Sequence, residues 1–400
     1  MLIAAASKGW LGFSSCYTEL SYALFMRSKN FLETNGIKLM KINYIKAATG
    51  IQNKIPNKKQ NKLISYHYFL GVTILIIFFC FAKNPILNLL IISQNYRKPL
   101  TEDWIFYAYE SKEKYASQIV KQKILIISGS NGLFGIDAKQ IEASTGIPTV
   151  NFAVHAGLGI DYMLYRAKKI LKPGDIVLIP LEFSLYHQRS DEQILENTLK
   201  NYIISYDHVY FDKLNFIDKL KVMVYPFGFN INDIKIIKEF LTKKSVFDKK
   251  AVFSQILERA NTGNCYTGIT LNRNGDETCN IGKSPTSDLK KLEKIDPALK
   301  EPIDVSDSLR DFCKFAKNNK ITIIPLYPAA LFYADYNTDN YKTYFSKINE
   351  FWSKEGILFK DSSNQSFLEE KMMFNTPYHP NDKGRNWRTK NIINILNNYL

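Results

Sequence analysis

Apolar runs and helical periods alternate along the middle of the chain. Short runs of apolar and β-branched residues predict three buried strands, at 123–128, 148–153 and 175–181. The segments between them, 137–145 and 161–171, have the spacing of amphipathic helices. Strands and helices that alternate in this way are typical of a parallel sheet with helices on both faces.

The same alternation returns towards the C-terminus. It predicts helices at 305–319, 341–355 and 383–400, and strands at 321–327 and 357–360. Residues 184–300 interrupt it with aromatic-rich amphipathic helices, which we interpret as a largely helical insertion in the same scaffold. We therefore expect an α/β fold with three layers, α/β/α, around a mostly parallel sheet.

A long apolar run stands ahead of these elements. Residues 64–82 (ISYHYFLGVTILIIFFCFA) carry no formal charge and approach the ~20 residues that a helix needs to cross a bilayer. Lysines are more frequent before the run than after it, which predicts a cytoplasmic N-terminal side. We interpret the run as a transmembrane signal anchor; a buried core helix and a cleaved signal peptide are the alternatives.

This span divides the chain into segments with different expected locations. Residues 1–39 show no clear period and are interpreted as an N-terminal extension, followed by a basic cytoplasmic segment at 40–63. After the span we expect a connecting segment at 83–120 and one extracytoplasmic domain at 121–400. The expected location is the cytoplasmic (inner) membrane, with the main domain in the periplasm or at the cell surface.

Composition and charge narrow the classes of protein. Of 400 residues, 46% are hydrophobic, which suffices for a substantial core and excludes a disordered chain. The formal net charge is +15, but the lysines are spread along the sequence and form no arginine-rich stripe. We therefore expect no nucleic-acid partner, and attribute the charge to solvated surface and to attraction for anionic lipid or polysaccharide.

The strongest chemical signal is the sequence ILIISGSNGLFGID at 124–137. Its apolar strand ends in a Gly- and Ser-rich turn that opens a helix, and this turn carries Ser130 at the carboxyl end of the strand. Open α/β sheets place ligands and nucleophiles at this edge. His379 lies in the turn before the last helix and can return to the same edge, so we predict a Ser130–His379 pair.

Two of the five cysteines bracket a loop rich in Gly, Asn and Thr. In an oxidising compartment Cys265 and Cys279 can form a disulfide that closes this loop, and otherwise they remain free thiols. No metal ion and no cofactor are expected at the Ser130–His379 pair.

Three sequence blocks resemble the SGNH (GDSL-like) hydrolase superfamily. They are ISGSNGLFGID around Ser130, VNFAVHAGLGIDYML after the second strand, and YHPNDKGRNWRT around His379. The resemblance is strongest to a membrane-anchored branch that contains alginate O-acetylation proteins and the D-alanyl transfer protein of lipoteichoic acid. It covers roughly residues 121–186 and 320–400, and it implies an SGNH fold, which is flavodoxin-like.

The resemblance implies roles for residues in these blocks. Ser130 would be the nucleophile, His379 the general base, and Gly157 a backbone donor to the oxyanion. From the sequence itself we place three further residues at the oxyanion site or in the cleft: Asn131, His155 beside Gly157, and Glu182 at the end of the third strand. The alternatives are that His155 binds a loop carbonyl and that Glu182 is a solvated surface residue.

Two positions depart from the pattern of the superfamily. An acidic residue usually stands shortly before the histidine, whereas this chain has Asn375, which can orient an imidazole without supplying a full charge. The asparagine block after the third strand is also missing, and Leu181-Glu182-Phe183 stands in its place. Removing the acid of a catalytic triad can cost ~10⁴ in rate.

The expected function is that of a serine esterase or O-acyltransferase. It would act on acyl groups, O-acetyl in particular, of a cell-surface polysaccharide or glycolipid, with a membrane O-acyltransferase as acyl donor. A different reading is a catalytically weak or inactive relative that binds glycan or scaffolds an export complex. A minor alternative is an NAD-binding Rossmann enzyme, because Gly129, Gly132 and Gly135 follow a strand.

Overall fold

The computed structural model describes residues 70–73, 102–223, 249–286, 289 and 303–400. The chain divides into two compact units, and the fold reported below belongs to the second, Gly71–Leu400. Within the described ranges, no helix combines the length and apolar character needed to cross a membrane. The predicted span at 64–82 lies outside those ranges except for a helical stretch at 70–73, as do the predicted segments 1–39 and 40–63.

The centre of this unit is a four-stranded parallel sheet in the order β2-β1-β3-β4. A second, two-stranded parallel sheet pairs β5 with β6. The strands are β1 (Ile124–Ile126), β2 (Thr149–Asn151), β3 (Ile176–Pro180), β4 (Thr322–Leu326), β5 (Ala330–Leu331) and β6 (Phe367–Leu368). The four longer runs expected at 123–128, 148–153, 175–181 and 321–327 each contain one strand of the main sheet.

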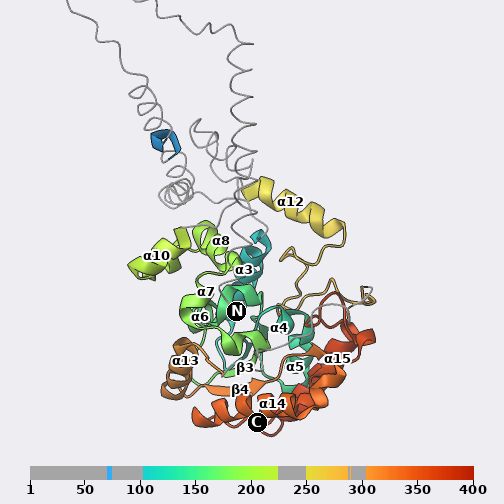
Figure 1. Cartoon of the computed structure of the whole chain (residues 1–400). Coiled ribbons are helices and arrows are strands. Elements are labelled where there is room, and N and C mark those ends of the chain that lie inside the picture. Colours follow the sequence, from blue (N-terminus) through green and yellow to red (C-terminus); the bar gives the residue numbers. More distant parts are fainter. Residues whose placement is uncertain (1–69, 74–101, 224–248, 287–288, 290–302) are drawn as a thin grey trace, which may run out of the picture. The chain divides into compact units, whose positions relative to one another are not determined.

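Helices cover both faces of the main sheet (Figure 1). Leu125 and Val177 point into the larger apolar cluster, on the side of α6 and α13, whereas Ile124 and Leu178 point into a smaller cluster with α5 and α15. The bounds are α3 (Asp103–Gln118), α4 (Ser130–Gly135), α5 (Ala138–Thr145), α6 (Gly159–Lys168), α13 (Asp307–Asn318), α14 (Asp339–Lys354) and α15 (Asp382–Leu396). Because both faces are covered, β1 and β3 at the centre of the sheet are apolar throughout.

The segment expected to connect the span to the domain contains a helix of the core. In α3, Ile105, Ala108 and Tyr109 are buried in the larger cluster. Lys112 is buried with them, and its Nζ donates to the carbonyl oxygen of Ala153 at 2.6 Å. Burial lowers the pKa of Lys112 to about 7. The sequence did not predict this helix, because polar side chains such as Lys112 interrupt the apolar positions of its buried face.

The fifth strand predicted at 357–360 is wrong. Gly356 has a φ of +74°, and Ile357 N donates back to Trp352 O at 2.9 Å, so the chain turns on itself to close α14. Leu358 then points outward and is 65% exposed. Phe359 packs its ring against Tyr327, at 4.7 Å between centroids. Short apolar runs do not distinguish strand pairing from such side-chain packing.

The expected insertion contains helices and a long loop in its described parts, and it also contributes to the core. Its helices are α7 (Ser190–Gln193), α8 (Asn197–Tyr206), α9 (His208–Lys213), α10 (Phe216–Met223) and α12 (Lys249–Asn261). The loop that follows α12 docks on the end of β2, where Asn151 N donates to Asn274 O at 2.8 Å. Asp276 accepts from the backbone N–H of Ala138 at 2.8 Å and of Lys139 at 3.1 Å, and so caps α5.

A buried ion pair fixes the C-terminal helix to the end of β4. Both terminal nitrogens of Arg388 contact the carboxylate of Asp361, with Nη1 at 3.1 Å from Oδ1. Nη2 also donates to Tyr327 O at 2.8 Å. This bidentate contact is geometrically specific. It therefore holds the loop before α15, which carries His379, at the carboxyl edge of the sheet.

Candidate active site

Ser130 begins α4 directly after the turn that follows β1. Gly129 in this turn has no space for a side chain, because a Cβ there would lie 2.5 Å from Ala156 N and from Glu182 Oε1. Ser130 itself is partly exposed. Its N–H has no acceptor, and its Oγ no hydrogen bond, among the described residues. The turn thus presents Ser130 at the carboxyl edge of the sheet with both groups available.

Glu182 lies beneath this turn and is 2% exposed. Its Oε1 accepts from Asn131 N at 2.9 Å, and its Oε2 accepts from Gly129 N at 3.1 Å and Ser128 Oγ at 3.3 Å. Burial raises the pKa of the carboxyl group, and these hydrogen bonds oppose the shift. No cation of the described residues forms an ion pair with it. Glu182 therefore supports the turn from below, and it is not a group that lines an open cleft.

Asn131 is predicted at the oxyanion site or in the cleft, and in the structure its side chain is engaged beneath the surface. Its side chain is fully buried. The Nδ2 group donates to Ala329 O and, at 3.4 Å, to Tyr378 O, while Oδ1 accepts from Ala329 N at 3.3 Å. Asn131 instead ties the serine turn to the residue next to His379.

His379 is buried on the loop before α15 and has a fixed Nδ1. This nitrogen lies 2.8 Å from Asn375 Oδ1 and 3.1 Å from Tyr266 Oη. Phe134 stacks on the ring, at 4.4 Å between centroids. Burial lowers the pKa of His379 to about 3, and the nearby His155 adds to this effect. The imidazole is therefore neutral, and its Nε2 has no hydrogen-bond partner among the described residues.

The structure brings His379 to the helix of Ser130 without a direct hydrogen bond between the two side chains. Phe134, which stacks on His379, lies one helical turn after Ser130. The residue before the histidine is bonded to Asn131, the residue after Ser130. Catalytic hydrogen bonds are often long or absent before substrate binds. Asn375 Oδ1 lies against His379 Nδ1, which is the contact that the predicted orientation of the imidazole requires.

His155 and Gly157 lie together on the segment after β2. Gly157 N donates to His155 Nδ1 at 3.0 Å, so this N–H is engaged in the geometry described. Burial lowers the pKa of His155, whose ring also meets Trp104 edge-on at 5.9 Å. The N–H of Ser130 is therefore available to an oxyanion. The N–H of Gly157 could donate to an oxyanion only if its hydrogen bond to His155 Nδ1 breaks.

The described residues form no cluster of three or more His, Cys, Asp or Glu side chains suited to a metal ion. A dinucleotide would need room at the end of β2, where an acid binds the ribose. Asn151 occupies that position, and its Nδ2 donates to Gly132 O at 2.9 Å. A Cβ at Gly275 of the docked loop would lie 2.6 Å from Asn151 O. The loop thus fills the place that the Rossmann alternative requires.

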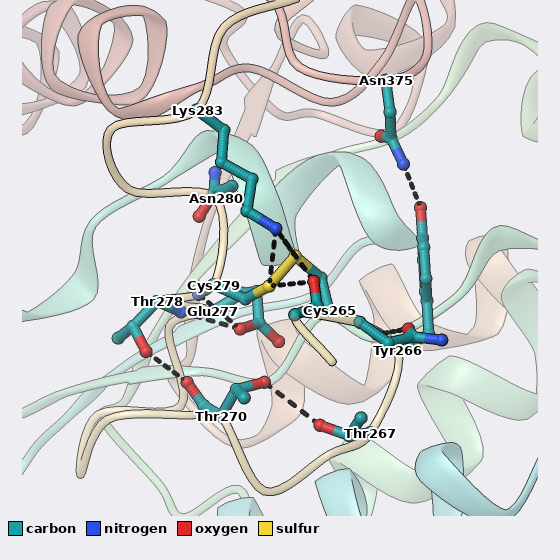
Figure 2. Close-up of a disulfide and its surroundings, with 12 residues drawn as sticks. Cys265, Tyr266, Thr267, Thr270, Glu277, Thr278, Cys279, Asn280, Lys283 and Asn375 are labelled. Carbon is teal, nitrogen blue, oxygen red and sulfur yellow. Dashed lines mark hydrogen bonds between the residues drawn. A yellow bond between two sulfur atoms is a disulfide. The ribbon is translucent and has the colours of Figure 1, made fainter. Parts of the chain in front are cut away.

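Tyr266 is the site residue that the sequence did not indicate. It adjoins Cys265, which is joined to Cys279 in a disulfide with 5.2 Å between the Cα atoms. Figure 2 shows the phenol ring extending from this loop towards Asn375. The Nδ2 group of Asn375 donates to Tyr266 Oη at 3.1 Å. Only the position of Tyr266 beside a paired cysteine marks it in the sequence.

The low pKa of His379 predicts a pH dependence of stability. Below the ordinary pKa of about 6.5, the unfolded chain binds a proton that the folded chain excludes down to about pH 3. The stabilisation from neutral His379 is complete above pH 6.5, and it falls by about 1.4 kcal/mol per pH unit on acidification. We expect the difference in unfolding free energy between wild type and His379→Gln to shrink accordingly between pH 7 and 4.5.

Urea unfolding of both proteins across this range measures the difference. The carboxyl groups of Glu182, Asp276 and Glu277, whose pKa burial raises, act in the opposite direction but are common to both proteins. A difference that does not change with pH would show that His379 titrates as an exposed histidine.

Comparison with known proteins gave no relatives. No protein-family model, no curated protein and no solved structure matches this chain.

Proposed function

We propose that this protein is a membrane-anchored, SGNH-like serine esterase or O-acyltransferase. The observation that carries the proposal is the contact of 2.8 Å between His379 Nδ1 and Asn375 Oδ1 beside the helix that begins at Ser130. When Nδ1 of the neutral imidazole donates its proton to Asn375 Oδ1, the lone pair of Nε2 is available to accept a proton. A serine, a base and a group that orients the base are the parts that nucleophilic acyl transfer needs.

In the reaction proposed, Ser130 Oγ attacks the carbonyl carbon of an ester while its proton passes to His379 Nε2. The N–H of Ser130 donates to the oxyanion that forms. The tetrahedral intermediate expels the alcohol, which takes the proton from Nε2 and leaves an acyl group on Ser130. Water or a sugar hydroxyl then gives its proton to Nε2 and attacks the acyl carbon. The second tetrahedral intermediate expels Ser130 Oγ, which takes the proton back from Nε2, and the acyl group leaves as a carboxylic acid or a new ester.

Acyl groups on an extracytoplasmic polysaccharide or glycolipid are the proposed substrates. The three blocks that resemble the membrane-anchored SGNH branch support this class, and a membrane O-acyltransferase would be the acyl donor by the same resemblance. The Cys265–Cys279 disulfide is compatible with an oxidising compartment. The apolar run at 64–82 and the net charge of +15 are compatible with a membrane or anionic glycan nearby.

A second candidate is a protein of the same fold that binds glycan or scaffolds an export complex without catalysis. Two observations favour it. Ser130 Oγ is not bonded to His379 among the described residues, and the Gly157 N–H is held by His155 at 3.0 Å. A neutral amide at position 375 also stabilises an imidazolium less than a carboxylate does.

A fluorophosphonate serine probe separates the two candidates. We expect the full chain in detergent to form an adduct on Ser130, located by mass spectrometry, and to lose it in Ser130→Ala and His379→Gln. His187→Gln is the matched control, because His187 pairs with Tyr344 Oη at 3.0 Å on another part of the domain. A folded wild-type protein that forms no adduct would favour the binding or scaffold function.

A further inference from the structure

The groups around Asn375 decide which nitrogen of His379 carries the proton. A carboxylate accepts hydrogen bonds at both oxygens, but an amide accepts at one end and donates at the other. With the accepting end on Nδ1, the ring keeps its proton there and Nε2 is basic. With the donating end on Nδ1, the proton moves to Nε2, which then cannot take the proton of Ser130.

Tyr266 contacts the donating end of this amide. Asn375 Nδ2 donates to Tyr266 Oη at 3.1 Å, and in this orientation of the amide Oδ1 faces His379 Nδ1 at 2.8 Å. Tyr266 Oη also lies 3.1 Å from Nδ1, so the three side chains form a closed triangle. Burial raises the pKa of Tyr266, which keeps the phenol protonated and uncharged.

We propose that Tyr266 is a positioning residue which, through the amide of Asn375, holds His379 as the Nδ1–H tautomer. This inference rests on the proposed function of Ser130 and His379, and it assigns part of that function to the insertion. An asparagine and a tyrosine together would then fix the tautomer of the histidine, which is one of the two roles of the acidic residue in the superfamily that the chain resembles.

The loop that carries Tyr266 is fixed on both sides of the triangle. The disulfide of Cys265 closes it next to Tyr266, as Figure 2 shows. Gly268, with a φ of +70°, lies so close to α3 that a Cβ would be 2.3 Å from Trp104 O. Asn280 Nδ2 donates to Pro380 O at 2.8 Å, one residue from His379. The phenol is therefore placed by covalent and backbone contacts and does not depend on its own rotamer alone.

The other groups around His379 fix its charge but not the position of its ring proton. Phe134 covers one face of the ring, and the titratable groups nearby are Tyr266 and His155, with Glu277 near Tyr266. With its pKa at about 3, His379 stays neutral over the pH range in which a serine hydrolase works. The question for catalysis is thus where the single ring proton lies.

The test combines a tautomer measurement with a double-mutant cycle. Nitrogen NMR of the full chain labelled with ¹⁵N-histidine resolves five histidines and reports the tautomer of each. We expect the Nδ1–H form of His379 in wild type and a mixture with the Nε2–H form in Tyr266→Phe. We also expect Tyr266→Phe to slow fluorophosphonate labelling of Ser130 about 10-fold.

Asn375→Asp provides a background in which the tyrosine is dispensable, because a carboxylate accepts in either orientation. There the effect of Tyr266→Phe on labelling is expected to fall below about 2-fold. Tyr165→Phe is the control, since the Tyr165 hydroxyl is buried without a partner among the described residues. Equal losses in both backgrounds, or an unchanged tautomer in Tyr266→Phe, would overturn the inference. If Ser130 is never labelled, the proposed function fails while the tautomer measurement still decides the role of Tyr266.

Discussion

Replacing Asn375 with aspartate is expected to accelerate acylation of Ser130 about 100-fold. The change places a full negative charge where Oδ1 now lies 2.8 Å from His379 Nδ1. This charge stabilises the imidazolium that forms as Ser130 loses its proton, and loss of the corresponding acid in a serine protease costs ~10⁴. Asn375 is only partly buried, so the new charge remains in contact with solvent.

The rate constant for fluorophosphonate labelling, measured from pH 5 to 9, quantifies the gain. The pKa of His379 should rise from about 3 at the same time, which the nitrogen NMR signal of the ring records. Asn340→Asp is the matched control, because it adds the same charge on the exposed first turn of α14. A raised pKa without faster labelling would mean that His379 is not the base for Ser130.

Replacing Glu182 with alanine is expected to lower the free energy of unfolding by about 4 kcal/mol. The variant leaves the buried N–H groups of Gly129 and Asn131 without their acceptor, and each unpaired group costs about 1–3 kcal/mol. A cavity beneath the turn adds to the loss. Relief from burying a carboxylate, whose pKa burial raises, offsets part of it.

Urea unfolding at pH 7 measures this change, with Glu110→Ala as the control on the exposed side of α3. We expect the loss of unfolding free energy in Glu182→Gln to lie between those in Glu182→Ala and Glu110→Ala. The reason is that an amide has one accepting oxygen for the two N–H donors. A loss below about 1 kcal/mol in Glu182→Ala would show that water replaces the carboxylate beneath the serine turn.

The sheet and the serine turn were predictable because their signals are local. A parallel strand buried on both faces is an uninterrupted apolar run, and β1, β3 and β4 lie within the predicted runs. The turn at Gly129 also follows from the sequence, since a strand that ends in Gly and Ser and opens a helix has few alternatives. The position of Asn375 relative to His379 was equally local, at four residues' separation.

The contacts that could not be predicted join distant parts of the chain. Tyr266 meets His379 across 113 residues, and no period in the insertion indicates that pairing. Glu182 was expected near the site, but a glutamate that ends a strand does not reveal whether it faces solvent or backbone N–H groups. Helix α3 was missed because Lys112, which is buried against Ala153 O, reads as a surface residue.

The position of the insertion also sets the order in which the sheet is completed during synthesis. Three strands, β1 to β3, emerge within about 60 residues, but β4 follows β3 only about 140 residues later. At ribosomal speeds of about 5–20 residues per second, the apolar edge of β3 stands open for about 7 to 28 s. An open edge of this kind pairs readily with strands of other chains. Chaperone capture of the nascent chain in that interval would therefore protect the edge of β3 from pairing with other chains.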